Sequence, residues 1–166
     1  MTVHVRRLAP HESNLQRHLR LRALRDAPDS FRETLDDAAA RPTSYWEDLT
    51  RSVTEPGPHV MFLACEGDQL VGSAYGLLDR ERAEAGRVGG MWMEPAWRGH
   101  GVGRALLQEI VAWARERRVS RLSLWAPAHS VAALSLYRRA GFRETGIRRP
   151  LPTNPALQIV EMEWQL

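Results

Sequence analysis

One stretch of the 166-residue sequence decides the fold: Met91-Trp92-Met93-Glu94-Pro95-Ala96-Trp97-Arg98-Gly99-His100-Gly101-Val102-Gly103-Arg104. An apolar run ends at a proline, a short loop carries three alternate glycines, and a helical pattern begins at once. Glycines let backbone amides approach a ligand closely, and the first turn of a helix presents free N–H groups at its positive end. This combination predicts an anion site suited to a pyrophosphate.

The glycine loop does not match the common phosphate-binding loops. Its spacing is not G-x-G-x-x-G, and no acid follows a second strand at the distance that a ribose needs, so a nicotinamide dinucleotide site is poorly supported. The Gly-Lys-Ser/Thr end of a P-loop is also absent. Taken alone, the three glycines are explained equally well by a glycine-rich turn.

The rest of the chain divides into short strands and amphipathic helices. Apolar residues recur every three to four positions after the loop, which predicts a long helix at 102–118. Other helices are predicted at 11–26, 30–40, 44–53 and 130–140, and strands at 2–8, 59–66, 69–78, 87–93, 121–126, 142–148 and 157–164, with a proline-rich loop at 149–156. Hairpins ahead of a strand–helix–strand unit argue against a uniformly parallel sheet. The order predicts a single mixed α/β (α+β) domain over 1–166, with one central sheet.

Three local signals mark the expected helix ends. Ser44-Tyr45-Trp46-Glu47 fits a capping box, in which the serine hydroxyl and the glutamate satisfy helix-end amides. Ser130 is a plausible N-cap residue for the helix at 130–140. Gly141 stands where a helix C-cap glycine belongs.

The charge pattern excludes several function classes. All 23 basic residues are arginine, so neither a Schiff-base lysine nor a P-loop lysine is available. The net charge is only +3, and acids lie among the arginines, as in 79–84, so no nucleic-acid partner is expected. The single cysteine, Cys65, excludes an intramolecular disulfide and a Cys-based zinc site. The histidines show no ligand spacing, so no metal is expected.

Nothing in the sequence indicates a membrane or a secreted location. No apolar run approaches the ~18–20 residues that a membrane helix needs. The N-terminal residues lack the apolar core of a signal peptide. We therefore expect a soluble, cytoplasmic protein with no membrane partner.

Two motifs together resemble the GNAT acetyltransferase superfamily. Residues 98–103 are similar to its Arg/Gln-x-x-Gly-x-Gly/Ala signature, and Met93-Glu94-Pro95 is similar to its hydrophobic-x-Pro strand end. Downstream, residues 130–142, SVAALSLYRRAGF, resemble the family segment N-x-x-A-x-x-x-Y-x-x-x-G-F. The strong part of the resemblance runs from Arg87 to about Gly146.

The resemblance implies a GNAT-like sheet and an acetyl-CoA cosubstrate. The sheet would be central and mostly antiparallel, with about seven strands flanked by helices, and two strands would splay apart around the acyl-CoA cleft. The pantetheine arm would pair with Met91, Trp92 and Met93. The pyrophosphate would bind at Arg98 and at the backbone amides of Gly99, His100, Gly101, Val102, Gly103 and Arg104. Ser130 stands where the family usually has an asparagine that contacts the pantetheine or a water. A serine still offers a hydroxyl, so we expect binding to be kept.

The resemblance also supplies a catalytic acid but no clear base. Tyr137 matches the family tyrosine that protonates the leaving CoA thiolate, although periodicity alone favours a core aromatic. The strand at 87–93 carries no acid, so Glu94 at its end is the nearest candidate base. An ordered water is an equal alternative. Further candidates are Glu161 and Glu163, which share one face of the last strand, with Glu81 and Glu84 in the loop before residue 87, although a solvated surface explains these glutamates better.

The expected function is the transfer of an acetyl group from acetyl-CoA to a primary amine of a small molecule, by direct attack in a ternary complex. The alternatives are a protein or peptide N-terminal acetyltransferase and a non-catalytic acyl-CoA-binding regulatory module. Trp92 or Trp125 is expected to line the acceptor pocket, and Trp113 to pack in the core. Dimers are common in the family, so a homodimer is among the expected assemblies. The sequence does not identify the acceptor. Arg148 and Arg149 are suited to an acidic or carboxylate-bearing one, although a solvated loop explains them better.

Overall fold

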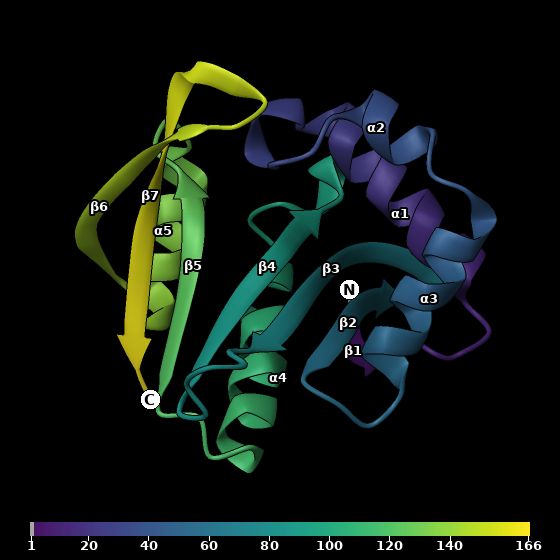
Figure 1. The fold of residues 1–166 in the computed structure, drawn as a ribbon, viewed down its shortest axis with the longest axis horizontal. Coiled ribbons are helices and arrows are strands. Elements are labelled where there is room, and N and C mark those ends of the chain that lie inside the picture. Colours follow the sequence, from purple (N-terminus) through teal and green to yellow (C-terminus); the bar gives the residue numbers. More distant parts are fainter. Residues whose placement is uncertain (1) are drawn as a thin grey trace.

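Seven strands form one sheet in the computed structural model, which describes residues 2–166 (Figure 1). Their spatial order is β1-β2-β3-β4-β5-β7-β6, and every neighbouring pair is antiparallel except β4 and β5. This confirms the mixed, mostly antiparallel sheet. The strands are β1 (Val3–Arg7), β2 (His59–Glu66), β3 (Gln69–Leu78), β4 (Ala85–Met93), β5 (Arg121–Pro127), β6 (Arg143–Leu151) and β7 (Asn154–Gln165).

Helices cover both faces of the first half of the sheet and one face of the second half (Figure 1). Side chains alternate between faces along a strand. In β2, Phe62 therefore packs in the cluster that contains α4 residues, whereas Leu63 packs against α1. The helices are α1 (Ser13–Asp26), α2 (Leu35–Ala39), α3 (Thr43–Thr54), α4 (Val102–Glu116) and α5 (Val131–Ala140), with 3-10 turns η1 (Pro28–Ser30) and η2 (Pro95–Trp97).

The long helix α4 anchors the core with its apolar stripe. Leu106, Ile110 and Trp113 are fully buried, which confirms that Trp113 is a packing residue. Gly76 of β3 makes room for the indole, because a Cβ there would lie 2.8 Å from the Trp113 ring. This close approach fixes α4, and with it the glycine loop at its N-terminus, against the sheet.

Strands β4 and β5 are paired only where they begin. Ala85–Arg87 pair in parallel with Arg121–Ser123, and the strands diverge beyond that point. A bulge in β4 accompanies the divergence: the register with β3 shifts between Ser73 and Tyr75, and Gly90 has a φ of +56° with its missing side chain directed at the Tyr75 ring. The predicted splay is therefore present, and it leaves the inner edges of β4 and β5 without strand partners.

Three local predictions are wrong. The helix predicted at 30–40 is interrupted, because Thr34 caps a separate helix by accepting a hydrogen bond from the Asp37 amide at 3.1 Å. The capping box at Ser44 does not form, since extended Pro42 starts the helix one residue earlier, without a side-chain cap. The loop predicted at 149–156 is largely a hairpin. Pro150 is tolerated in β6 because this strand lies at the edge of the sheet.

None of the helices within residues 2–166 is long and apolar enough to cross a membrane.

Candidate active site

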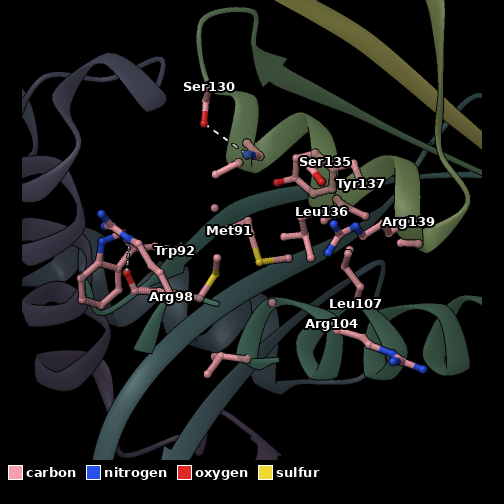
Figure 2. A pocket seen from close by; sticks show the side chains of 18 of the residues that line it. Met91, Trp92, Arg98, Arg104, Leu107, Ser130, Ser135, Leu136, Tyr137 and Arg139 are labelled. Atoms are coloured by element: carbon pink, nitrogen blue, oxygen red, sulfur yellow. Dashed lines mark hydrogen bonds between the residues drawn. The ribbon is translucent and has the colours of Figure 1, made fainter. Parts of the chain in front are cut away.

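A cavity of about 1050 Å³ lies in the gap between the splayed strands (Figure 2). Its walls come from β4, the glycine loop, one face of α4 as far as Arg115, α5, β5, Trp164 of β7 and the η1 segment. The structure brings to this one cavity most of the residues predicted from the sequence: Met91, Trp92, Met93, Arg98, Gly99, Gly101, Val102, Gly103, Arg104, Ser130 and Tyr137. Glu94 and His100 are not among its lining residues.

The glycine loop presents a row of free amides. Within residues 2–166, the N–H groups of Gly99, Gly101, Val102, Gly103 and Arg104 have no backbone acceptor. Gly99 and Gly101 have φ values of +80° and +84°, and a Cβ on either would meet nothing within 4 Å. The loop is therefore open above its backbone and lies at the positive end of the 15-residue α4. These features fit a pyrophosphate.

His100 differs from the rest of this row. Its amide donates to the Trp97 carbonyl at 3.3 Å, inside the turn that η2 begins. Its ring nitrogen Nδ1 lies 3.0 Å from the Arg98 carbonyl oxygen. The residue shapes the loop, and its amide is not among the free ones.

The backbone of β4 turns unpaired groups toward the cavity. The Glu94 amide donates to the Val71 carbonyl of β3 at 2.9 Å. Backbone groups of successive residues point to opposite sides of a strand, and Met93 stands opposite Gly72 in the register. The Met93 amide therefore points away from β3, into the gap.

Tyr137 lies on the α5 wall of the cavity, across from Met91 of β4 (Figure 2). Its side chain is only 7% exposed, and its ring packs edge-on against Phe142 at 6.0 Å. Burial raises the pKa of the phenol well above its ordinary value, so the hydroxyl keeps its proton at neutral pH. Within residues 2–166 no hydrogen-bond partner holds this hydroxyl, which leaves it free to donate into the cavity.

Ser130 caps α5, as predicted. Its Oγ accepts a hydrogen bond from the Ala133 amide at 3.2 Å. A hydroxyl that accepts one bond still has a proton to donate. Because Ser130 also lines the cavity, its hydroxyl serves the helix end and faces the cavity at the same time.

Comparison with known families decides the classification. The model of the acetyltransferase (GNAT) family matches residues 21–142. The chain belongs to the GNAT family. Membership places it among the acyltransferases, as the two motifs implied.

Named relatives of this GNAT protein act on different acceptors. It is 35% identical over 106 residues to an aminoglycoside N(6')-acetyltransferase type 1 from Stenotrophomonas maltophilia, covering 60% of this chain and 69% of the relative. It is 36% identical over 102 residues to the N-alpha-acetyltransferase RimI from Mycobacterium tuberculosis, covering 61% and 62%. A mycothiol acetyltransferase from Cellulomonas flavigena is 30% identical over 154 residues, but the chain spans only 42% of its length.

Solved structures share the whole fold of this GNAT chain at low identity. A GNAT acetyltransferase from Streptococcus pneumoniae superposes with a TM-score of 0.84 at 19% identity, covering 99% of both chains. Spermidine N-acetyltransferase from Vibrio cholerae, in complex with CoA and spermine, gives 0.79 at 15% identity, covering 98% and 95%. These likenesses confirm the GNAT fold and leave the acceptor open.

No acidic or imidazole side chain lines the cavity of this GNAT protein within residues 2–166. The carboxylate of Glu94 forms an ion pair with Arg22 of α1 instead of facing the gap. Glu161 accepts a hydrogen bond from the Thr145 hydroxyl at 2.9 Å, and Glu163 lies 3.6 Å from Arg121. The placement therefore does not favour Glu94 or the other glutamates as a base.

Asp26, at the end of α1, is a site residue that the sequence did not indicate. It accepts a hydrogen bond from Trp92 Nε1 at 2.9 Å and forms an ion pair with Arg98. Arg98 also donates to the Met93 carbonyl at 3.3 Å. Asp26 thus ties β4 and the glycine loop to α1. Its partners lie 66 and 72 residues away, so no local pattern points to it.

Proposed function

We propose that this protein transfers an acetyl group from acetyl-CoA to the primary amine of a small molecule, by direct attack in a ternary complex. One observation carries the proposal: a single cavity joins the free amides of the glycine loop to the buried, protonated phenol of Tyr137. An anion site and a neutral acid in one cavity match the two demands of a thioester donor, which has a pyrophosphate at one end and a thiolate leaving group at the other.

The chain contributes binding and positioning on the donor side. The free amides of residues 99 and 101–104 hold the pyrophosphate. The inner edge of β4 at Met91 and Met93 pairs with the amide groups of the pantetheine arm, as an added strand would. The inward Met93 amide donates to the thioester carbonyl oxygen and stabilises the charge that develops there. The last two steps use backbone groups of β4 that the splay leaves unpaired.

The acetyl transfer needs one acid from the protein. The acceptor nitrogen forms a bond to the acetyl carbonyl carbon, and the bond from that carbon to sulfur breaks. Tyr137 gives its proton to the departing thiolate. Because no carboxylate or imidazole within residues 2–166 lines the cavity, an ordered water takes the proton that the amine loses.

A latch at the mouth of the cavity favours a small acceptor over a peptide. The tip of the β6–β7 hairpin reaches the η1 segment (Figure 1), where the Thr153 hydroxyl donates to the Phe31 carbonyl at 3.1 Å. Beside it, the Asn154 side chain donates to Asp29 at 3.3 Å. An extended peptide would have to displace these two bonds, which we call the latch, whereas a small molecule fits beneath them. This supports a small-molecule amine over the peptide N-terminus on which a RimI-type relative acts.

Thiol release and calorimetry test the proposal together. The protein is titrated with CoA, and free thiol is measured with acetyl-CoA against amino acids, monoamines, polyamines, aminoglycosides and short peptides. We expect CoA to bind and thiol to appear with at least one small amine. Binding without turnover on any amine would favour the regulatory-module alternative. Absence of CoA binding would contradict the proposal as a whole.

A further inference from the structure

One side of the cavity is built from aromatic side chains. We call it the η1 side and define it by six lining residues: Ala27, Ser30, Phe31, Trp92, Trp125 and Pro127. Trp92 comes from β4 and Trp125 from β5, so the two indoles lie on the strands that diverge. Both strands turn these rings toward the face of the sheet opposite α4 and α5, because the side chains next to Trp92 and Trp125 pack in the α4 cluster. The glycine loop is assigned to the donor, which leaves this side of the cavity for the proposed acceptor.

An arginine guanidinium group already lies over each of the three aromatic rings on the η1 side. The Arg20 guanidinium lies 4.8 Å from the centre of the Phe31 ring. That of Arg22 lies 5.4 Å from the Trp92 ring, and that of Arg149 lies 5.0 Å from the Trp125 ring. A cationic acceptor would compete with these arginines for the same aromatic surfaces.

Three nearby carboxylates are already paired with arginine, whereas Asp29 and Glu161 accept hydrogen bonds from neutral side chains. Glu33 binds Arg20 at 3.0 Å and Arg41 at 2.8 Å. Asp26 and Glu94 form the ion pairs with Arg98 and Arg22 described above. A polyamine or an aminoglycoside would therefore bring several positive charges to a side of the cavity where the carboxylates of Asp26, Glu33 and Glu94 are already neutralised, and charges left unpaired are costly to desolvate.

Arg149 is the exception among the three arginines. Within residues 2–166 it has no carboxylate partner, whereas Arg20 and Arg22 each have one. It stands in β6 opposite Ile159 of β7, and its guanidinium reaches the Trp125 ring at the rim of the cavity. Its sequence neighbour Arg148 lies 3.8 Å from Glu144. The N–H donors of the Arg149 guanidinium thus have no carboxylate within residues 2–166 to accept from them.

We propose that the acceptor is an amine with a compact aromatic or branched apolar body and a carboxylate, as in an apolar α-amino acid, and that Arg149 binds this carboxylate. This inference rests on the proposed acetyl transfer. The apolar body packs between Trp92, Trp125 and Phe31, while the carboxylate meets the guanidinium that lacks a partner. The amine of such a molecule brings one positive charge, which its own carboxylate offsets.

Matched acceptors test the class. Thiol release with acetyl-CoA is measured for phenylalanine, for 2-phenylethylamine (the same body without the carboxylate), for spermidine and for kanamycin, with products verified by mass. We expect kcat/KM for phenylalanine to exceed that of each of the other three by about tenfold, the value of one charge-assisted hydrogen bond. Higher kcat/KM with spermidine or kanamycin would overturn the inference while leaving the acetyl transfer intact.

Two adjacent variants test the residue. Arg149→Gln should lower kcat/KM for phenylalanine about tenfold and change that for 2-phenylethylamine less than about twofold. Arg148→Gln, the matched control one residue away, should change neither. Equal losses in the two variants, or equal losses with the two acceptors, would overturn the role of Arg149.

Calorimetry tests the inference even if no acceptor is acetylated. Phenylalanine is titrated by calorimetry into the protein saturated with CoA, and we expect binding that Arg149→Gln weakens about tenfold. If CoA binds but phenylalanine does not, the inference is wrong and the donor side of the proposed function stands. If CoA itself does not bind, the proposed function fails first.

Discussion

The two sides of the cavity differ in what they are made of. The glycine-loop side consists of five free backbone amides from one short segment, those of residues 99 and 101–104. The η1 side consists of side chains from segments far apart in the sequence, with Phe31, Trp92 and Trp125 at its centre. Backbone groups bind a pyrophosphate in the same way in any such loop, whereas each side chain can change alone. One side is thus suited to a constant donor and the other to a variable acceptor.

The largest effect should come from the residue between the two sides. Tyr137→Phe removes the proposed acid and keeps the ring, so kcat should fall at least about tenfold and up to about a hundredfold. The Kd for CoA, measured by calorimetry, should stay nearly unchanged. An unchanged kcat would show that Tyr137 takes no part in the mechanism and does not link the two sides of the cavity.

The next effect should be confined to the glycine-loop side. Gly101→Val places a side chain in the open space above the loop and should weaken CoA binding about tenfold, because the amides lose their approach to the pyrophosphate. The matched control is Gly67→Val in the β2–β3 turn, where φ is also positive, at +55°, and the space is also open. If the control weakens CoA binding equally, backbone strain and not position is responsible.

A smaller effect should be confined to the η1 side. Thr153→Val removes the hydroxyl of the latch, and the acceptor KM should rise about threefold, the value of one neutral hydrogen bond, with the Kd for CoA unchanged. The comparison variant is Thr145→Val, which removes a hydroxyl bond at the other end of the same hairpin. A change in CoA affinity with Thr153→Val would show that the two sides are not independent.

The smallest effect should be on the stability of the fold and should leave both sides of the cavity unchanged. Arg6 donates to Glu12 at 2.8 and 2.9 Å, and these bonds hold the pKa of the Glu12 carboxyl below its usual range. A lowered pKa in the folded protein means that the contribution to stability is present at neutral pH and is lost as the pH falls through that pKa. Glu12→Gln should therefore cost about 1 kcal/mol or less near pH 7 and still less near pH 3.

Urea unfolding at the two pH values measures this loss, with exposed Glu55→Gln as the control. Turnover and CoA affinity should be unchanged in both variants. A loss that is equal at the two pH values would contradict the assignment to the charged carboxylate.

The glycine-loop side was predictable because its information is local. A proline, three alternate glycines and a helical stripe specify a strand end, an open loop and a helix N-terminus within 14 residues. The amide of His100 is the exception, since a turn bond to Trp97 withdraws it from the row. No residue pattern distinguishes that amide from its neighbours.

The η1 side was predictable only in part. Trp92 and Trp125 were assigned to the diverging strands, and both line the cavity. Phe31 and Asp26 gave no signal, because their roles depend on partners far away in the chain. The proline-rich segment at 149–156 was predicted as a loop, since the sequence does not reveal that β6 is an edge strand and can accept Pro150.

The short pairing of β4 with β5 has a consequence for association between molecules. An unpaired strand edge at the rim of a sheet is a template on which other chains aggregate. Here β6, one of the two outer strands, is protected by its irregular register at residues 144–148, by Pro150 and by exposed arginines. The bare edges of β4 and β5 lie in the interior of the sheet instead. The outer edge at β6 is thus protected against pairing with other proteins, whereas the edges of β4 and β5 stay open to a narrow, extended molecule.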